Sequence, residues 1–305
     1  MPPLMYKQKS LNNRRRAFTL IEIMVAAVIT IIMVGLVIQI TSEVLKIWNK
    51  SVGKLAANAE ARIAMELLTS DLETALLINN NQQWLRVETE TDVGAPTAGQ
   101  TVGLKLFAPA LDRPKLKADG TNEAGNICAI AYRLAFAPAY NGASTDSFVL
   151  FRALEGPSGT FTELLGPDAD DRQVSLDESI GTTPDFWKAD TTNIINPDNY
   201  LAGNIVDFKI YIYGIDETTG GEVILNDPNE DGIIEAADLF AYGGTDSTGE
   251  VPHFAEILLT VVSDEGLDIL SLPDLAGTGY ANEEEVVLKQ GEVFKRRVYF
   301  QARPL

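Results

Sequence analysis

Five oxygen-bearing side chains between positions 227 and 238 have the spacing of ligands for a metal ion. They stand at positions 1, 3, 5, 9 and 12 of this loop and are Asp227, Asn229, Asp231, Glu235 and Asp238. Calcium binds six to eight hard oxygens from a short loop, and alternate residues can turn their side chains to one centre. Gly232 allows the sharp turn, and Ile233 can supply a backbone carbonyl. The pattern predicts a structural calcium site.

This stretch resembles the calcium loops of EF-hands and, in ending on aspartate, those of dockerins. It departs from the EF-hand pattern at Pro228 and at Asp238, which stands where glutamate is usual. Aspartate has the shorter side chain, so we expect weaker affinity, as suits a site outside the cytoplasm. We expect Asp238 to lie in the first turn of a helix over 236–242. The alternative is an acidic surface turn, since the chain has 43 acidic residues.

The first 40 residues combine a basic leader with a long apolar run. Residues 1–17 include five lysines and arginines and no acid, and from Phe18 to Ile40 the only formal charge is Glu22. This run is long enough for one helical crossing of a bilayer, which needs about 20 residues. The basic flank predicts a cytoplasmic N-terminus and a translocated C-terminal part. A carboxylate in hydrocarbon is costly unless it is paired, so Glu22 needs a partner.

The run from Ala17 to Glu22, AFTLIE, resembles the prepilin cleavage and methylation motif of type IV pilins and type II secretion pseudopilins. The resemblance implies that prepilin peptidase cuts between Ala17 and Phe18 and methylates the new amine. It also implies that Glu22 pairs with the N-terminal amine of a neighbouring subunit in a filament; a general-base role is the weaker alternative. The family has glycine before the cut, so with Ala17 we expect slower processing. The competing reading is an unprocessed signal anchor.

We expect one helix over residues 18–78, of which about 18–40 lie in the membrane. No proline occurs between Pro3 and Pro96, and polar residues fill the faces between apolar stripes. The main stripe recurs at steps of three and four residues, and a second stripe follows it at Leu68, Leu72 and Leu76. We expect the main stripe to pack on the protein's own globular domain rather than on a partner. Its members are Leu45, Trp48, Val52, Leu55, Ala59, Ile63 and Leu67.

Residues 79–305 read as a mainly β globular domain. Alternating apolar residues between turn-forming segments predict strands at 84–90, 102–108, 126–136, 147–153, 204–214, 255–263 and 292–302. We expect long loops over 155–203 and 215–250, and a short helix capped by Asn282. The predicted fold class is α+β: a long N-terminal helix packed on an antiparallel sheet, as in pilins.

Other stretches resemble the large minor members of the same family. ARIAMELLTSDLETALL at the end of the helix, the strands at 132–134 and 150–152, and the terminal KRRVYFQA are similar to J-like minor pseudopilins and W-like minor pilins. This implies a minor subunit of the bacterial inner membrane, with a periplasmic C-terminal domain, that initiates or caps a type IV pilus or type II secretion filament. Its partners would be prepilin peptidase and other pilins or pseudopilins. The alternative is an adhesin-like, membrane-anchored protein that uses the pilin route for delivery; a major pilin is the weaker third reading.

Composition argues against two further classes of function. The net charge of −19 disfavours binding to nucleic acid. The single cysteine, Cys128, cannot form an intramolecular disulfide, and His253 is the only histidine. The sequence has no P-loop, dinucleotide fingerprint or zinc-type cysteine pair. A Ser-His-Asp or Cys-His arrangement would have to use His253, and an isolated histidine is more often structural than catalytic. We therefore expect no enzymatic activity.

Overall fold

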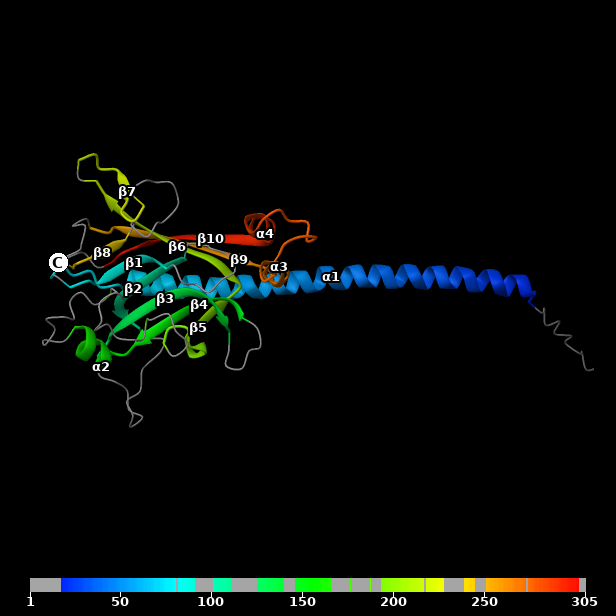
Figure 1. The fold of residues 1–305 in the computed structure, drawn as a ribbon, viewed down its shortest axis with the longest axis horizontal. Coiled ribbons are helices and arrows are strands. Elements are labelled where there is room, and N and C mark those ends of the chain that lie inside the picture. Colours follow the sequence, from blue (N-terminus) through cyan, green and yellow to red (C-terminus); the bar gives the residue numbers. More distant parts are fainter. Residues whose placement is uncertain are drawn as a thin grey trace, which may run out of the picture. The chain divides into compact units, whose positions relative to one another are not determined.

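The computed structural model describes residues 18–80, 82–90, 101–110, 125–139, 146–165, 176, 187, 193–216, 218–227, 239–244, 251–272 and 274–301. The chain divides into two compact units, Met1–Asn49 and Lys50–Leu305. Helix α1, Leu20–Glu73, begins in the first unit and ends in the second. The second unit also holds two antiparallel sheets (Figure 1). The predicted class, α+β with a long N-terminal helix and antiparallel sheets, is confirmed.

The larger sheet has six strands in the order β5-β4-β3-β2-β1-β8. Their bounds are β1 Leu85–Glu90, β2 Thr101–Pro109, β3 Ile127–Pro138, β4 Asp146–Glu155, β5 Tyr200–Gly203 and β8 Phe240–Tyr242. The smaller sheet has the order β10-β9-β6-β7. Its strands are β6 Ile205–Ile215, β7 Glu222–Ile224, β9 Phe254–Val262 and β10 Gly291–Tyr299. All seven predicted strands are present, and the short strands β5, β7 and β8 were not predicted.

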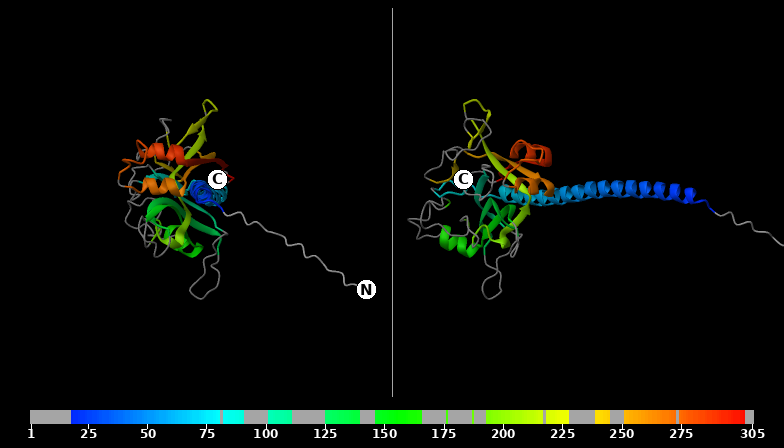
Figure 2. Two further views of the ribbon diagram at one scale, coloured as in Figure 1. Left: turned by 90° about the vertical axis from the view of Figure 1, so that its right-hand side faces the viewer. Right: turned by 45° about the vertical axis from the view of Figure 1, so that its right-hand side comes forward.

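Several short helices complete the second unit. Between β4 and β5 lie α2, Pro157–Gly159, the π-helical turn η1, Thr160–Leu164, and the 3-10 turn η3, Pro197–Asn199. The helices α3, Asp264–Leu270, and α4, Glu283–Gln290, pack together beside the four-stranded sheet (Figure 2). The predicted cap of α4 is confirmed, because the Asn282 side chain accepts a hydrogen bond of 2.9 Å from the Glu285 amide.

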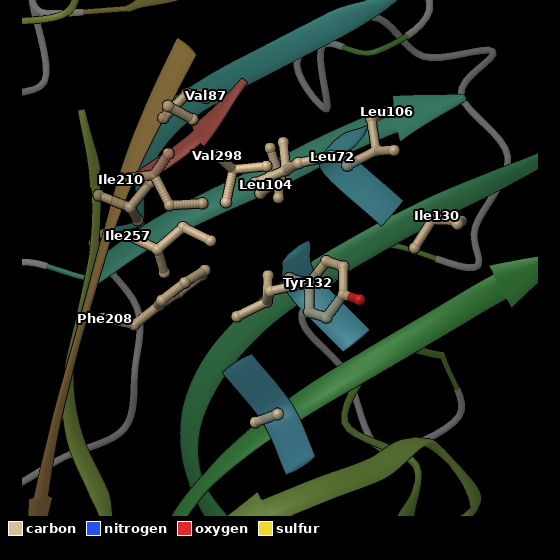
Figure 3. Close-up of a cluster of buried hydrophobic side chains, with 14 of the residues drawn as sticks. Leu72, Val87, Leu104, Leu106, Ile130, Tyr132, Phe208, Ile210, Ile257 and Val298 are labelled. Atoms are coloured by element: carbon tan, nitrogen blue, oxygen red, sulfur yellow. The ribbon is translucent and has the colours of Figure 1, made fainter. Parts of the chain in front are cut away.

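The inner faces of both sheets share one hydrophobic core with the second-unit part of α1. Leu72 of α1, Leu104 of β2, Tyr132 of β3 and Ile257 of β9 all contribute side chains to it, as Figure 3 shows. The other face of the larger sheet carries a second core around Phe107. This second core includes residues from the segment between β4 and β5, so part of the predicted loop 155–203 is built into the domain.

The helix ends at Glu73, five residues earlier than predicted. The amide of Leu76 donates a 2.8 Å hydrogen bond to the Phe107 carbonyl of β2, and Ala75 and Leu77 are buried. The chain after Glu73 therefore runs along the sheet rather than continuing as a helix. Apolar spacing cannot distinguish these two outcomes, because both bury the same side chains.

Within the second unit, most of the main apolar stripe of α1 is exposed, so the prediction that it packs on the protein's own domain was wrong there. In the second unit Val52, Leu55 and Ile63 are 48%, 69% and 55% exposed. The packed face instead holds mostly small residues that the stripe omitted, together with the second stripe at Leu68 and Leu72. Its buried residues are Ala57, Ala61, Ala64, Met65, Leu68, Thr69, Asp71 and Leu72.

The helix predicted over 236–242 is also wrong where the structure describes it. Residues Phe240–Tyr242 form β8, which pairs with β1 in the register Leu85 to Tyr242 and Val87 to Phe240. Both aromatic side chains are buried in the main core. The segment therefore forms an edge strand of the larger sheet, although its sequence is also compatible with a helix. Among its described residues, the predicted loop 215–250 thus contains the strands β7 and β8.

Candidate functional site

The start of α1 places the predicted assembly residue in a local hydrogen-bond motif. Ala17 lies outside the described residues, and Phe18 is 80% exposed. A Glu22 carboxylate oxygen, Oε2, accepts hydrogen bonds from the Thr19 amide at 2.9 Å and from Thr19 Oγ1 at 3.0 Å. The Glu22 amide donates to Thr19 Oγ1 at 3.4 Å. This reciprocal arrangement is a capping box, which satisfies amides that the first helical turn leaves unpaired.

The capping box holds a carboxylate within one turn of the predicted cleavage point. Cleavage before Phe18 would place a positive amine beside this end of the helix, where the helix dipole also favours negative charge. Glu22 can therefore cap the N-terminus of α1 and still form an ion pair with a nearby cation. The capping role of Thr19 was not predicted, although a T-x-x-E signature before an apolar run is typical of a capping box.

The predicted calcium ligands lie almost entirely outside the described residues. Asn229, Asp231, Ile233, Glu235 and Asp238 are in this group, so the structure does not test whether they meet. Asp227 is described and only 1% exposed. Burial, followed by the charge of Asp227, raises the pKa of Tyr211 to about 12. Within the part of the chain that the structure describes, no three His, Cys, Asp or Glu side chains gather as a metal site.

The residue before Asp227 fixes the start of this loop to the smaller sheet. Asn226 is fully buried, and its side chain accepts from the Ile212 amide and donates to the Ile210 carbonyl, both at 2.7 Å. The Leu225 amide adds a third bond to β6 at 2.7 Å. The Asn226 amide group thus continues the β-ladder beyond β7. Nothing in the sequence pattern singled it out.

A buried ionic cluster, which was not predicted from the sequence, joins α1 to the larger sheet. Arg152 of β4 donates to both carboxylate oxygens of Asp71, from Nε at 2.9 Å and from Nη2 at 3.1 Å. Tyr132 of β3 donates its hydroxyl to Asp71 at 2.5 Å. Tyr132 and Arg152 are direct cross-strand neighbours, and all three side chains are buried. Burial, and next the Asp71 charge, raises the pKa of Tyr132 well above its usual value.

The family comparison agrees with the N-terminal motif. Residues 12–38 match the family model described as the prokaryotic N-terminal methylation motif. Among solved structures the chain is similar to a type IV-like pilin from Thermus thermophilus, with 9% sequence identity and a TM-score of 0.36. The aligned region covers 80% of this chain and 96% of that one. No curated protein matches this sequence. Residues 12–38 of this chain thus carry the prepilin-type N-terminal motif.

Proposed function

We propose that the protein is a pilin or pseudopilin subunit that assembles into a filament through α1. The methylation motif at residues 12–38 supports delivery and processing by the prepilin route. Part of α1 is long and apolar enough to cross a membrane, which supports insertion in the inner membrane with the β-rich unit in the periplasm. Within this class we propose a minor subunit that initiates or caps a type IV pilus or type II secretion filament. Its role is structural rather than catalytic.

The observation that carries this proposal is the outward face of α1 in the second unit. A helix turns about 100° per residue, so Val52, Leu55 and Ile63 fall opposite Ala57 and Ala61. The first three are exposed and the last two are buried. Apolar residues at this spacing normally face a packing partner, and such a stripe left exposed marks an interaction surface. A neighbouring helix of a filament would cover it.

Leu55→Glu should prevent incorporation of the protein into a filament or a complex with other pilins. The substitution places a charge in the outward stripe, where burial against a partner would then be costly. The fold should survive, because Leu55 is 69% exposed. A matched control is Leu288→Glu, since Leu288 is 83% exposed and lies on α4 rather than on α1. Pull-down with partner pilins after co-expression measures the result.

The same pull-down separates the filament subunit from the adhesin-like alternative. A membrane-anchored adhesin delivered by the pilin route has no need of pilin neighbours. If the unchanged protein is processed but never recovered with pilins, the adhesin-like function is favoured. If Leu55→Glu and Leu288→Glu are recovered equally with partner pilins, the outward stripe is not the contact.

Processing should remove residues 1–17 and expose Phe18. The leader has five basic and no acidic residues, so the product becomes more negative by five charges. Ala17→Gly should speed the cut, since glycine is the residue that the resemblance to prepilins places there. Mass spectrometry of the mature N-terminus, with and without prepilin peptidase, measures this. An intact leader, or a cut after the apolar run, would overturn the proposed route.

We also propose a structural calcium ion at residues 227–238. The buried Asp227 and the anchor at Asn226 support it, because they hold the first predicted ligand in place. Millimolar calcium should raise the melting temperature of the whole protein in detergent. A free concentration ten times Kd adds about 1.4 kcal/mol to stability by linkage. Magnesium should do less, because it keeps its waters and prefers a tighter octahedron.

Two aspartate variants separate a loop site from general charge effects. Asp231→Ala should remove the gain with calcium, whereas Asp274→Ala, an exposed acid outside the loop, should keep it. Thermal unfolding with calcium and then with chelator reads out both. A melting temperature that ignores calcium, with no heat of binding by calorimetry, would reduce the motif to an acidic turn.

A further inference from the structure

Helix α1 has two apolar faces in the second unit, and the exposed one carries the larger side chains along residues 52–64. The exposed face has Val52, Leu55 and Ile63, while the buried face over the same turns has Ala57, Ala61 and Ala64. Hydrophobic burial is non-directional and roughly proportional to the apolar area removed from water. Over these turns, area alone would favour burial of the opposite face. Further along the helix, Met65, Leu68 and Leu72 add apolar area to the packed face. Apolar area therefore favours different faces in successive turns, and a directional interaction would settle the choice.

The Asp71 cluster supplies a directional interaction on the packed side. Arg152 holds both oxygens of Asp71, and the Tyr132 hydroxyl holds one of them. Arg152 and Tyr132 project from neighbouring strands toward the same core, and Figure 3 shows Tyr132 pointing into it. A half-turn of the helix would carry Asp71 away and remove this carboxylate from a buried arginine and a buried phenol. Such separation of a buried pair is strongly unfavourable.

Two further polar contacts flank the same face. Glu60 accepts from the Tyr200 hydroxyl at 2.6 Å and from the Gly203 amide at 2.8 Å, which ties α1 to β5. Asn58 donates to Glu292 of β10 at 2.9 Å. Both contacts are partly solvated and therefore weaker than the buried cluster. They favour the same rotation of α1 as the Asp71 cluster, because neither contact could form if the helix were turned by half a turn.

We propose that Asp71, Arg152 and Tyr132 are positioning residues that select which face of α1 packs and which face is presented to partners. Buried polar groups are known to set register where apolar contacts are degenerate. Here the apolar contacts are ambiguous over residues 52–64, where both faces of the helix are apolar. The selection of a face stands on this chain alone; only the use of the outward face rests on the proposed function.

Cysteine labelling measures which face is outward, independently of assembly. The native Cys128 is buried, so the background is low. Ile63→Cys reports the outward face and Ala61→Cys the packed face, each in the full chain in detergent. In the unchanged cluster we expect Ile63→Cys to react at least about tenfold faster, as buried sites react only through local opening. With Asp71→Leu, Arg152→Met and Tyr132→Phe together, the two rates should come within about threefold while unfolding stays cooperative.

The outcomes distinguish positioning from simple stability. If the apolar cluster folds and the ratio of labelling rates is unchanged, core shape selects the face and the inference is overturned. If that variant does not fold, Asp71→Asn serves in its place, and it should raise the labelling of Ala61→Cys relative to Ile63→Cys. An unchanged ratio there also overturns the inference. Neither measurement needs a filament, so failure of the proposed function would show in the pilin pull-down alone.

Discussion

Glu22→Ala should abolish incorporation into a filament while membrane insertion and cleavage continue. The carboxylate is expected to pair with the N-terminal amine of a neighbouring subunit, and removal of one partner leaves a charge uncompensated in an apolar setting. The structure adds a second consequence, since the variant also loses the capping box with Thr19. A lost cap costs about 1 kcal/mol, too little to prevent assembly by itself. Recovery with partner pilins, normalised to the processed protein, measures the effect.

Two control variants separate charge pairing from capping. Glu22→Gln keeps an oxygen that can accept from Thr19 but removes the charge, so it should fail nearly as badly as Glu22→Ala. Thr19→Val removes the capping hydroxyl and keeps the charge, so it should assemble with only a modest loss. If Glu22→Gln assembles normally and Thr19→Val does not, Glu22 acts through its own helix start rather than through a neighbour.

Asp71→Ala should cost about 3–5 kcal/mol of unfolding free energy, the usual penalty for breaking a buried ion pair by removal of one partner. Arg152 is 1% exposed and would lose the carboxylate to which its Nε and Nη2 donate. Urea or thermal unfolding of the whole protein in detergent gives the difference. Asp71→Leu combined with Arg152→Met should be less harmful than Asp71→Ala, because it leaves no buried charge behind. A loss below about 1 kcal/mol for Asp71→Ala would mean that water reaches the cluster.

Features set by local pattern were open to prediction from the sequence. The basic leader, the small residue before Phe18 and the apolar run occur in order within 40 residues, so the prepilin motif needs no tertiary information. Strands such as 205–215 alternate apolar and polar residues because one side faces the core, and this period is visible in the sequence. The capping box at Thr19 and Glu22 spans four residues and belongs to the same class.

Features set by distant contacts were not open to prediction. The helix ends at Glu73 because Leu76 bonds to β2, and β8 forms because Phe240 and Tyr242 meet β1, about 150 residues earlier in the chain. The packed face of α1 is the clearest example. The stripe with the larger side chains was predicted to be buried, because a sequence pattern shows only the spacing and size of apolar residues. Asp71 lies on the packed face, and its partners Tyr132 on β3 and Arg152 on β4 are 61 and 81 residues away in the sequence. Only the folded chain brings these three side chains together.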